Sequence, residues 1–292
     1  RIPTLMIVTW RGEPRLKDEP QHELMGRITD ALLDNIEVPH APFPSELTDV
    51  MPALEVARAA MKETDLPYAF IMAKGSVAPE ALTETPLTAG PGGALADRTS
   101  GGARPTRLAA LECLLAAAPD AAAIIATTGK SGRELFTLAD REQHLYQVGS
   151  MGGASAMGLG VALNASRPVV VLDGDGAALM KLGNFATIGA WAPENLLHIL
   201  IDNGVHDSTG GQATVSAGVD FARIALACGY AGAATTDHLA GFERAFLAAL
   251  DAKGPRLIHI RVRPGSMKRL GRPTVPPDAV ARRFKAFLRK PL

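Results

Sequence analysis

The sequence predicts an α/β fold in two domains, each with a parallel sheet covered by helices on both faces. Three observations predict it. The chain has 292 residues, enough for about two domains at the usual domain size. Strand-like and helix-like segments alternate along most of it, as in parallel sheets. Runs such as residues 169–173 (VVVLD) and 196–202 (LLHILID) are apolar without alternating, which is typical of strands buried on both sides.

The composition is that of a globular protein without a strongly charged partner. Hydrophobic residues make up 47% of the chain, and 30 basic side chains balance 30 acidic ones. This balance predicts neither a nucleic-acid nor a membrane partner. The basic excess after Arg261 is interpreted as a solvated C-terminal helix. Because the chain has 2 cysteines and no apolar run of membrane-spanning length, we expect a cytoplasmic protein.

The first domain is predicted over residues 1–84. Strands are expected at residues 3–10 and 68–74, both short apolar runs typical of buried strands. Between them, helical patterns cover residues 22–35 and 47–62.

Residues 85–104 are predicted to link the domains, because their composition shifts to glycine, proline, threonine and serine. The second domain is expected over residues 105–292. Its elements are predicted as strands at 122–127, 145–148, 168–173, 196–202 and 256–262, with helices at 177–190 and 237–252. In such sheets ligands bind beyond the carboxyl ends of the strands, so functional residues are expected there.

Two glycine-containing turns follow predicted strands. Residues 127–132 (TTGKSG) open a helix but lack the first glycine and the spacing of a Walker A loop. Residues 149–153 (GSMGG) carry glycines that allow a backbone to approach a ligand closely. Each turn also fits a structural role, an ordinary strand–helix turn or tight helix–strand packing.

The strongest signal is residues 173–176 (DGDG), which end one strand and open a helix, with Asn203 ending the next strand. Neighbouring parallel strands end at the same edge, so the Asp175 carboxylate and the Asn203 amide oxygen would face one point. Such hard oxygen ligands suit Mg²⁺, which adds ligand phosphates and water. The helix N-terminus after Gly176 favours those phosphates. The residues alone thus predict a Mg²⁺–diphosphate site, with a plain acidic turn as the alternative.

These stretches resemble thiamine-diphosphate-dependent enzymes, in which Gly-Asp-Gly is followed by Asn at the next strand end. The resemblance narrows to the family of phosphonopyruvate decarboxylase and its relative sulfopyruvate decarboxylase. It is carried by residues 10–22 (WRGEPRLKDEPQH), 127–136 (TTGKSGRELF), 149–160 (GSMGGASAMGLG), 174–203 and 201–212 (IDNGVHDSTGGQ). It implies two domains of the thiamine-diphosphate-binding fold, one for the pyrimidine ring and one for the diphosphate.

The resemblance implies thiamine diphosphate and Mg²⁺ as cofactors. Asp175, Asn203 and the carbonyl of Val205 would hold the metal. Met151 matches the bulky residue beneath the cofactor that keeps its two rings bent, with core packing as the alternative. The other residues implied to bind the cofactor are Gly129, Ser131, Gly174, Gly176 and Ala177.

The implied activity is nonoxidative decarboxylation of 3-phosphonopyruvate to phosphonoacetaldehyde and CO₂, a lyase reaction of phosphonate biosynthesis. The substrate would be a small anionic 2-oxo acid. The alternatives are sulfopyruvate as substrate, a carboligase of the acetolactate synthase type, and a noncatalytic cofactor-binding subunit. A carboligase would normally carry a middle domain, for which residues 85–104 leave no room.

A proton donor is expected near the loop over residues 11–21, where related decarboxylases place polar active-site residues. Gln21 and His22 mark this place, and His22 is the one able to donate; a surface histidine is the alternative. The cations that could bind the phosphonate are Arg11, Lys130, Arg133 and His206, each also compatible with a solvated charge.

The resemblance also implies a glutamate that hydrogen-bonds the pyrimidine ring. Glu13 and Glu19 lie in a loop and do not match it. Residues 1–84 are therefore interpreted as the C-terminal half of a pyrimidine-binding domain, apparently incomplete, and residues 105–292 as a complete diphosphate-binding domain. The missing part is expected upstream of Arg1 or on another chain. At least a homodimer is expected, because in this family the cofactor bridges domains of different subunits.

Overall fold

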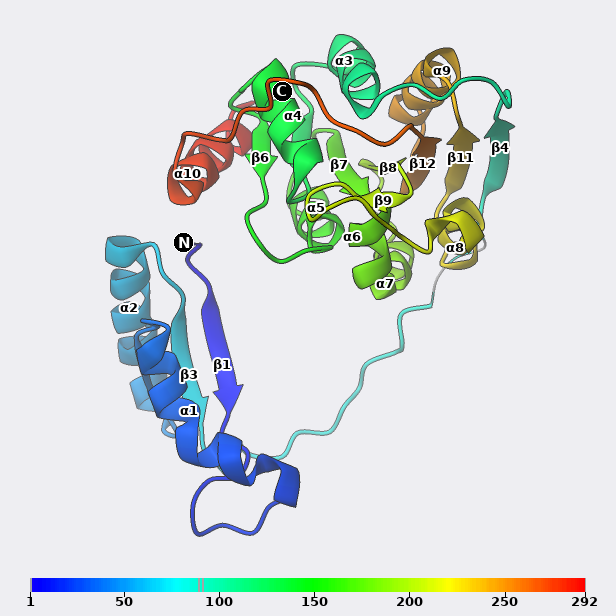
Figure 1. Cartoon of the computed structure of the whole chain (residues 1–292). Helices are drawn as coiled ribbons and strands as arrows, with labels where there is room; N and C mark the ends of the chain where they lie inside the picture. The colour runs from blue at the N-terminus through cyan, green and yellow to red at the C-terminus, as the bar shows by residue number, and fades with distance from the viewer. Residues whose placement is uncertain (1, 89, 91, 292) are drawn as a thin grey trace. The chain divides into compact units, whose positions relative to one another are not determined.

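The computed structural model describes residues 2–88, 90 and 92–291. The chain divides into two compact units, Arg1–Thr85 and Pro86–Leu292, and each is described by itself (Figure 1). No helix in the described ranges is both long enough and apolar enough to cross a membrane.

The first unit is a three-stranded parallel sheet between two helices. Its strands lie in the order β1–β3–β2. In the central strand, Ala69 and Ile71 pack with Leu33 of one helix, whereas Tyr68 and Phe70 pack with Ala57 of the other. The two helices therefore cover opposite faces of the sheet. The elements are β1 (Leu5–Thr9), α1 (Glu23–Asn35), β2 (His40–Pro42), α2 (Leu47–Thr64) and β3 (Tyr68–Met72).

The structure corrects one prediction in this unit. Strand β1 was expected to be buried, yet its residues alternate between exposed and half-buried, and Ile7 is 57% exposed. Among the described residues β1 pairs only with β3, and only Met6 and Val8 of this strand pack against the core. An apolar run predicts a strand but does not distinguish an edge strand from a central one. Strand β2 was not predicted.

The second unit is built on a seven-stranded parallel sheet, and the five strands predicted there are confirmed. The strands lie in the order β4–β11–β12–β8–β7–β5–β6. They are β4 (Ala94–Arg98), β5 (Ala123–Ala126), β6 (His144–Tyr146), β7 (Val169–Gly174), β8 (Leu196–Asp202), β11 (Gly232–Thr236) and β12 (Arg256–Arg261). A separate antiparallel pair is formed by β9 (Val205–His206) and β10 (Gln212–Ala213).

Helices cover both faces of this sheet (Figure 1). On one face lie α3 (Arg107–Ala117), α4 (Lys130–Leu138) and α9 (Leu239–Leu250); on the other lie α5 (Ala154–Ala162), α6 (Asp175–Met180), α7 (Gly183–Trp191) and α8 (Phe221–Ala227). Helix α10 (Pro277–Leu288) packs against the edge strand β6. The single helix predicted over residues 177–190 is two helices, because Lys181 leaves the helical conformation (φ −133°, ψ 41°) before Gly183 opens the next helix.

The connections of this sheet determine where a ligand can bind. The chain runs from β5 outward to β6 and then back to β7 on the other side of β5. Helices α4 and α5, which follow β5 and β6, therefore lie on opposite faces of the sheet. A crevice opens beyond the carboxyl ends of the strands at such a switch point. The loops after β5, β6, β7 and β8 meet there.

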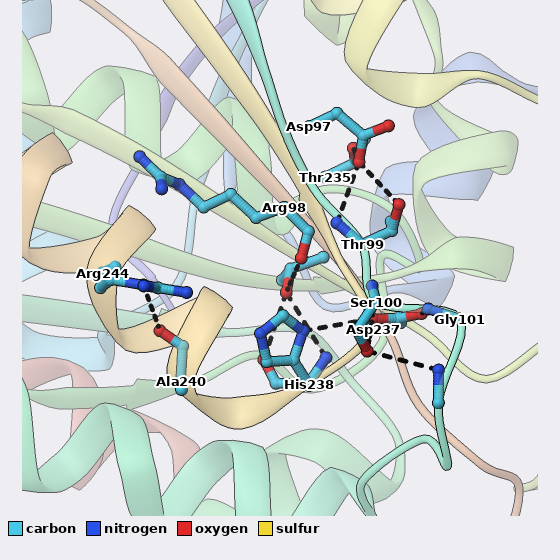
Figure 2. A network of polar contacts seen from close by, with 12 residues as sticks. Asp97, Arg98, Thr99, Ser100, Gly101, Thr235, Asp237, His238, Ala240 and Arg244 are labelled. Atoms are coloured by element: carbon cyan, nitrogen blue, oxygen red, sulfur yellow. Dashed lines mark hydrogen bonds and ion pairs between the residues drawn. The ribbon is translucent and has the colours of Figure 1, made fainter.

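Strand β4 lies inside the segment predicted as a linker, so that prediction is wrong for Ala94–Arg98. The strand pairs in register with β11. Beyond its end, the Asp237 carboxylate accepts hydrogen bonds from the backbone N–H groups of Ser100 (2.7 Å) and Gly101 (2.8 Å) (Figure 2). Burial would raise the pKa of Asp237, but these bonds outweigh it and lower that pKa to about 2. The strand sequence ALADR contains alanine and charged residues, which seldom form strands, and it lies between glycine-rich stretches, so composition alone did not indicate it.

Strand β6 carries a fully buried histidine. His144 Nδ1 donates to the carbonyl of Ala139 (2.9 Å), and Nε2 has no hydrogen-bond partner among the described residues. Burial lowers the pKa of His144 to about 4, because a second proton would place an unsolvated charge in the core.

Because the pKa of His144 is lowered in the folded protein, we expect the protein to lose stability in weak acid. Between its ordinary pKa of about 6.5 and the native value of about 4, only the unfolded chain binds the proton, so the free energy of unfolding falls as pH falls. We expect a contribution of about 2–3 kcal/mol between pH 7 and pH 4.5. Urea unfolding of the wild type and His144→Phe at both pH values measures it, since the variant lacks the titrating group. Equal losses in the two proteins would contradict the assignment.

Candidate functional site

A cavity of about 280 Å³ lies at the switch point of the second unit. It is bounded by the loops that follow β5, β6, β7 and β8. All nine residues predicted in this unit to bind the cofactor or the metal line it: Gly129, Ser131, Met151, Gly174, Asp175, Gly176, Ala177, Asn203 and Val205. Residues distant in the sequence are thus brought to one place because their strands end at one edge.

One wall of the cavity is the turn after β5. Gly129 has a positive φ of 106°, which favours glycine, and precedes helix α4 directly. A Cβ atom there would lie 3.1 Å from the hydroxyl of Ser208. The first N–H groups of the helix, including that of the buried Ser131, have no acceptor within the helix. The wall therefore presents donors and the positive end of a helix dipole, which suit an anion.

Another part of the cavity lining is the carboxylate of Asp175, which is 3% exposed. Its Oδ2 accepts a hydrogen bond from the Thr214 hydroxyl (2.5 Å), and no cationic side chain pairs with it among the described residues. Burial raises the pKa of Asp175, the Thr214 bond opposes the rise, and the charge of Asp202 adds to it. A buried carboxylate without a cation is costly, so this group suits a divalent metal ion.

A chain of hydroxyl groups fixes that carboxylate. Thr214 Oγ1 lies 3.0 Å from Ser216 Oγ, and the Ser216 hydroxyl donates to Asp202 (2.8 Å). The second oxygen of Asp202 lies 3.0 Å from Nε2 of the buried His259. Burial would raise the pKa of Asp202, but the His259 and Ser216 bonds lower it below its usual range.

The third wall holds Asn203, whose amide is fixed by its neighbours. Its Nδ2 donates to Asp207 Oδ2 (2.7 Å), and its Oδ1 accepts from the Val205 N–H (3.2 Å). Because the nitrogen is held by Asp207, the oxygen is the end of the amide available to a cation.

Asp207 belongs to a buried network of ion pairs. The carboxylate accepts from Arg107 Nη1 (3.1 Å), while Nε and Nη2 of the same guanidinium donate to Glu134 (2.9 and 3.3 Å). Arg107 is 5% exposed and Glu134 is fully buried. The network ties helices α3 and α4 to the loop after β8.

Met151 lies in the loop after β6 and is 54% exposed where it lines the cavity. This exposure rules out core packing within the described residues. The next residue, Gly152, has a positive φ, and a Cβ atom on it would lie 2.5 Å from the carbonyl oxygen of Ala177. The Met151 loop is therefore packed directly on the first turn of helix α6.

Gln21 and His22 belong to the first unit, which is described by itself. They end a short 3₁₀ helix (Pro20–His22). Nδ1 of His22 lies 3.2 Å from Asp18, which also accepts two hydrogen bonds from Arg11 Nε and Nη2 (2.9 and 2.6 Å). The Arg11 guanidinium holds the pKa of Asp18 well below its usual range. Arg11, considered as a phosphonate ligand, is thus already paired.

Sequence reasoning missed Arg107, Thr214 and Asp207. The last two fall in the polar segment just after Asn203, and a run of hydroxyl and acidic residues following a predicted metal ligand was a usable signal. No comparable signal marks Arg107, because its partners Glu134 and Asp207 lie 27 and 100 residues away.

Comparisons with known proteins identify relatives of this chain. Residues 127–260 match the family described as thiamine pyrophosphate enzyme, C-terminal TPP binding domain. The whole chain is 51% identical to phosphonopyruvate decarboxylase of Streptomyces viridochromogenes and covers 74% of that protein.

Two further comparisons give a relative that aligns with about half of the chain and a solved structure with a similar fold. Sulfopyruvate decarboxylase subunit beta of Methanothermobacter thermautotrophicus is 42% identical over 143 residues, which are 49% of this chain and 75% of that protein. Among solved structures, the thiamine diphosphate-dependent 4-hydroxybenzoylformate decarboxylase of Rhodococcus jostii RHA1 shares the fold with a TM-score of 0.50 and 20% identity, over 72% of this chain and 43% of that one.

Proposed function

Because this chain belongs to the phosphonopyruvate decarboxylase family, we propose that it catalyses the thiamine-diphosphate-dependent decarboxylation of 3-phosphonopyruvate to phosphonoacetaldehyde and CO₂. The cavity at the switch point carries the proposal. It gathers an anion-binding helix start, a buried carboxylate without a cation and an oriented amide oxygen. These are the groups that a diphosphate and its metal ion require.

The residues fit Mg²⁺ as the metal. Asp175, Asn203 and the Val205 carbonyl offer hard oxygen atoms, and phosphate oxygens would complete an octahedron. Gly129, Ser131, Gly176 and Ala177 would bind the diphosphate through backbone N–H groups and the Ser131 hydroxyl, with Gly174 leaving room beside them.

When bound, thiamine diphosphate would supply a nucleophilic carbon for the keto group and a cationic thiazolium ring able to accept the electrons left by departing CO₂. The protein's part is to hold and orient. Met151, which lines the cavity, would support the bound cofactor and help to keep its two rings in the reactive conformation. His22, held by Asp18, is proposed to deliver the proton that completes the aldehyde, with Gln21 beside it. A homo-oligomer is proposed, so that a pyrimidine-binding domain of a second copy completes the site.

A phosphonate rather than a sulfonate is the proposed substrate. The whole chain aligns with a single-chain relative named for phosphonopyruvate, whereas the match to the relative named for sulfopyruvate covers 49% of this chain and concerns one subunit. Both acids carry a tetrahedral anionic group, so an assay with both substrates compares them directly.

The test is CO₂ release by the purified protein with thiamine diphosphate and Mg²⁺, using 3-phosphonopyruvate, 3-sulfopyruvate and pyruvate. We expect the highest kcat/KM with 3-phosphonopyruvate and phosphonoacetaldehyde as product. Faster turnover of 3-sulfopyruvate would reassign the substrate. Cofactor binding without release of CO₂ from any acid would support the noncatalytic alternative.

Met151→Ala is expected to lower kcat more than it lowers cofactor affinity. The diphosphate anchors remain, whereas the support beneath the ring junction is lost and the reactive shape is less populated. We expect kcat to fall by about tenfold and the cofactor Kd to change by less than about threefold. Met51→Ala is the matched control, since Met51 is 62% exposed and lies outside the cavity lining. An unchanged kcat in Met151→Ala would remove Met151 from the site.

A further inference from the structure

A second cavity, of about 530 Å³, adjoins the one described above. The two share part of their lining, namely Thr127, Thr128, Gly129, Lys130 and Ser208. The outer cavity extends from this shared wall to Gln147 and Val148 after β6 and to Arg272 in the segment before helix α10. A small ligand held there would lie directly beside the proposed cofactor site.

The charged side chains that line the outer cavity are all positive. Its described residues include three cations, Lys130, Arg133 and Arg272, and no aspartate or glutamate. The inner cavity differs, because Asp175 and Asp207 line it together with its cations. The outer cavity is therefore the more favourable place for a multiply charged anion.

Arg133 is already used to build this cavity. Its Nε donates to the carbonyl of Gly271 (2.8 Å) and its Nη2 to that of Leu270 (3.1 Å). The Gly271 N–H donates in turn to the Thr137 hydroxyl (3.0 Å). Helix α4 thus holds the backbone next to Arg272 in place, and Arg272 reaches the cavity from a fixed segment.

Lys130 and Arg272 remain available. Within the described ranges neither side chain forms a salt bridge or hydrogen bond, unlike Arg107 and Arg133. The hydroxyl of Thr127, which is 3% exposed and lines both cavities, also has no hydrogen-bond partner there. A buried hydroxyl is ordinarily paired, so an absent partner at this shared wall points to a ligand.

We propose that the outer cavity is the subsite for the phosphonate group of the substrate and that Lys130 and Arg272 bind its charge. The inference rests on the proposed function and adds its specificity-determining residues. A guanidinium matches the oxygens of a phosphonate in a paired geometry, and a lysine adds a point charge. The carboxylate and keto groups of the substrate would then face the shared wall.

The experiment measures binding of two unreactive ligands to the holoenzyme by calorimetry. Phosphonoacetate carries a phosphonate, and malonate has a carboxylate in its place. We expect Arg272→Gln and Lys130→Met each to weaken phosphonoacetate by at least about tenfold, because a charge-assisted contact is lost, and malonate by less than about threefold. Arg269→Gln is the matched control, an equal charge change on the same segment at a residue outside the cavity lining.

Two measurements keep the outcome decisive. Thiamine diphosphate affinity should be unchanged in Arg272→Gln, because Arg272 lines only the outer cavity. Arg272→Lys retains the charge and should lose less phosphonoacetate binding than Arg272→Gln, which a general loss of folding would not produce. Wild-type phosphonoacetate affinity in both Arg272→Gln and Lys130→Met, or equal losses for the two ligands, overturns the subsite.

The subsite and the proposed function fail separately. If the wild type decarboxylates 3-phosphonopyruvate while both variants bind phosphonoacetate normally, the function stands and the subsite is wrong. If the wild type releases no CO₂ but binds phosphonoacetate through Lys130 and Arg272, the anion site stands and the reaction is wrong.

Discussion

Replacing Asp175 by asparagine is expected to abolish Mg²⁺-dependent binding of thiamine diphosphate while the fold survives. The carboxylate is buried and has no cationic partner in the described chain, so the metal ion would be its only compensating charge. An amide supplies one neutral oxygen instead, and Mg²⁺ tolerates such a loss poorly. We expect the cofactor Kd measured with Mg²⁺ to rise by about 100-fold or more, since even partners of metal ligands cost about 10–100-fold.

Calorimetry with and without Mg²⁺ measures this effect, and circular dichroism checks the fold. Thr214→Val offers a graded comparison, because it removes the hydrogen bond that orients Asp175 but keeps the charge. Its loss should be smaller, about tenfold. Asp278→Asn, on helix α10 outside the cavity lining, is the control for loss of an acidic residue. An unchanged affinity of Asp175→Asn for thiamine diphosphate in the presence of Mg²⁺ would contradict the metal-site proposal.

The parts of this site found from the sequence are those that strand topology places together. Asp175 and Asn203 follow two strands whose apolar runs predict burial, and strands joined through one crossover segment pair side by side in parallel. Their convergence at one edge then follows without knowledge of the remaining fold. The same reasoning located the turns containing Gly129 and Met151, which follow the neighbouring strands β5 and β6.

The parts not found depend on packing that no local pattern records. Strand β11 (GAATT) consists of glycine, alanine and threonine, and strand β4 (ALADR) contains two alanines and two charged residues, so each gives only a weak strand signal. Residues 3–10 were recognised as a strand, but burial depends on which neighbours pair with it. Arg107 and Glu134 looked like ordinary helical charges, since charged residues are rarely buried, and only the fold shows that they pair.

The buried Arg107–Glu134 pair predicts a large effect on stability. Arg107→Met is expected to lower the free energy of unfolding by about 3–5 kcal/mol, the usual result of removing one partner from a buried ion pair. Glu134 is fully buried, and apart from Arg107 it accepts only the Met267 N–H among the described residues. Its charge would be left without a counterion. Asp207 would also lose the hydrogen bond from Arg107. Because Asp207 orients the amide of Asn203, the orientation of that amide would be less fixed.

A double-mutant cycle separates this explanation from a simple packing defect. Glu134→Gln keeps an oxygen for the Met267 N–H but removes the charge, so Arg107→Met combined with Glu134→Gln should be less destabilised than the sum of the single variants by about 1–3 kcal/mol. Arg283→Met is the control, because the Arg283–Asp140 pair is also doubly hydrogen-bonded but its side chains are 27% and 26% exposed. Arg283→Met should lower the free energy of unfolding by about 1 kcal/mol or less.

Additive effects in the Arg107–Glu134 cycle would mean that burial of Arg107, not its charge, matters. A Mg²⁺ affinity lowered in Arg107→Met but not in Arg283→Met would connect the network to the metal-binding loop.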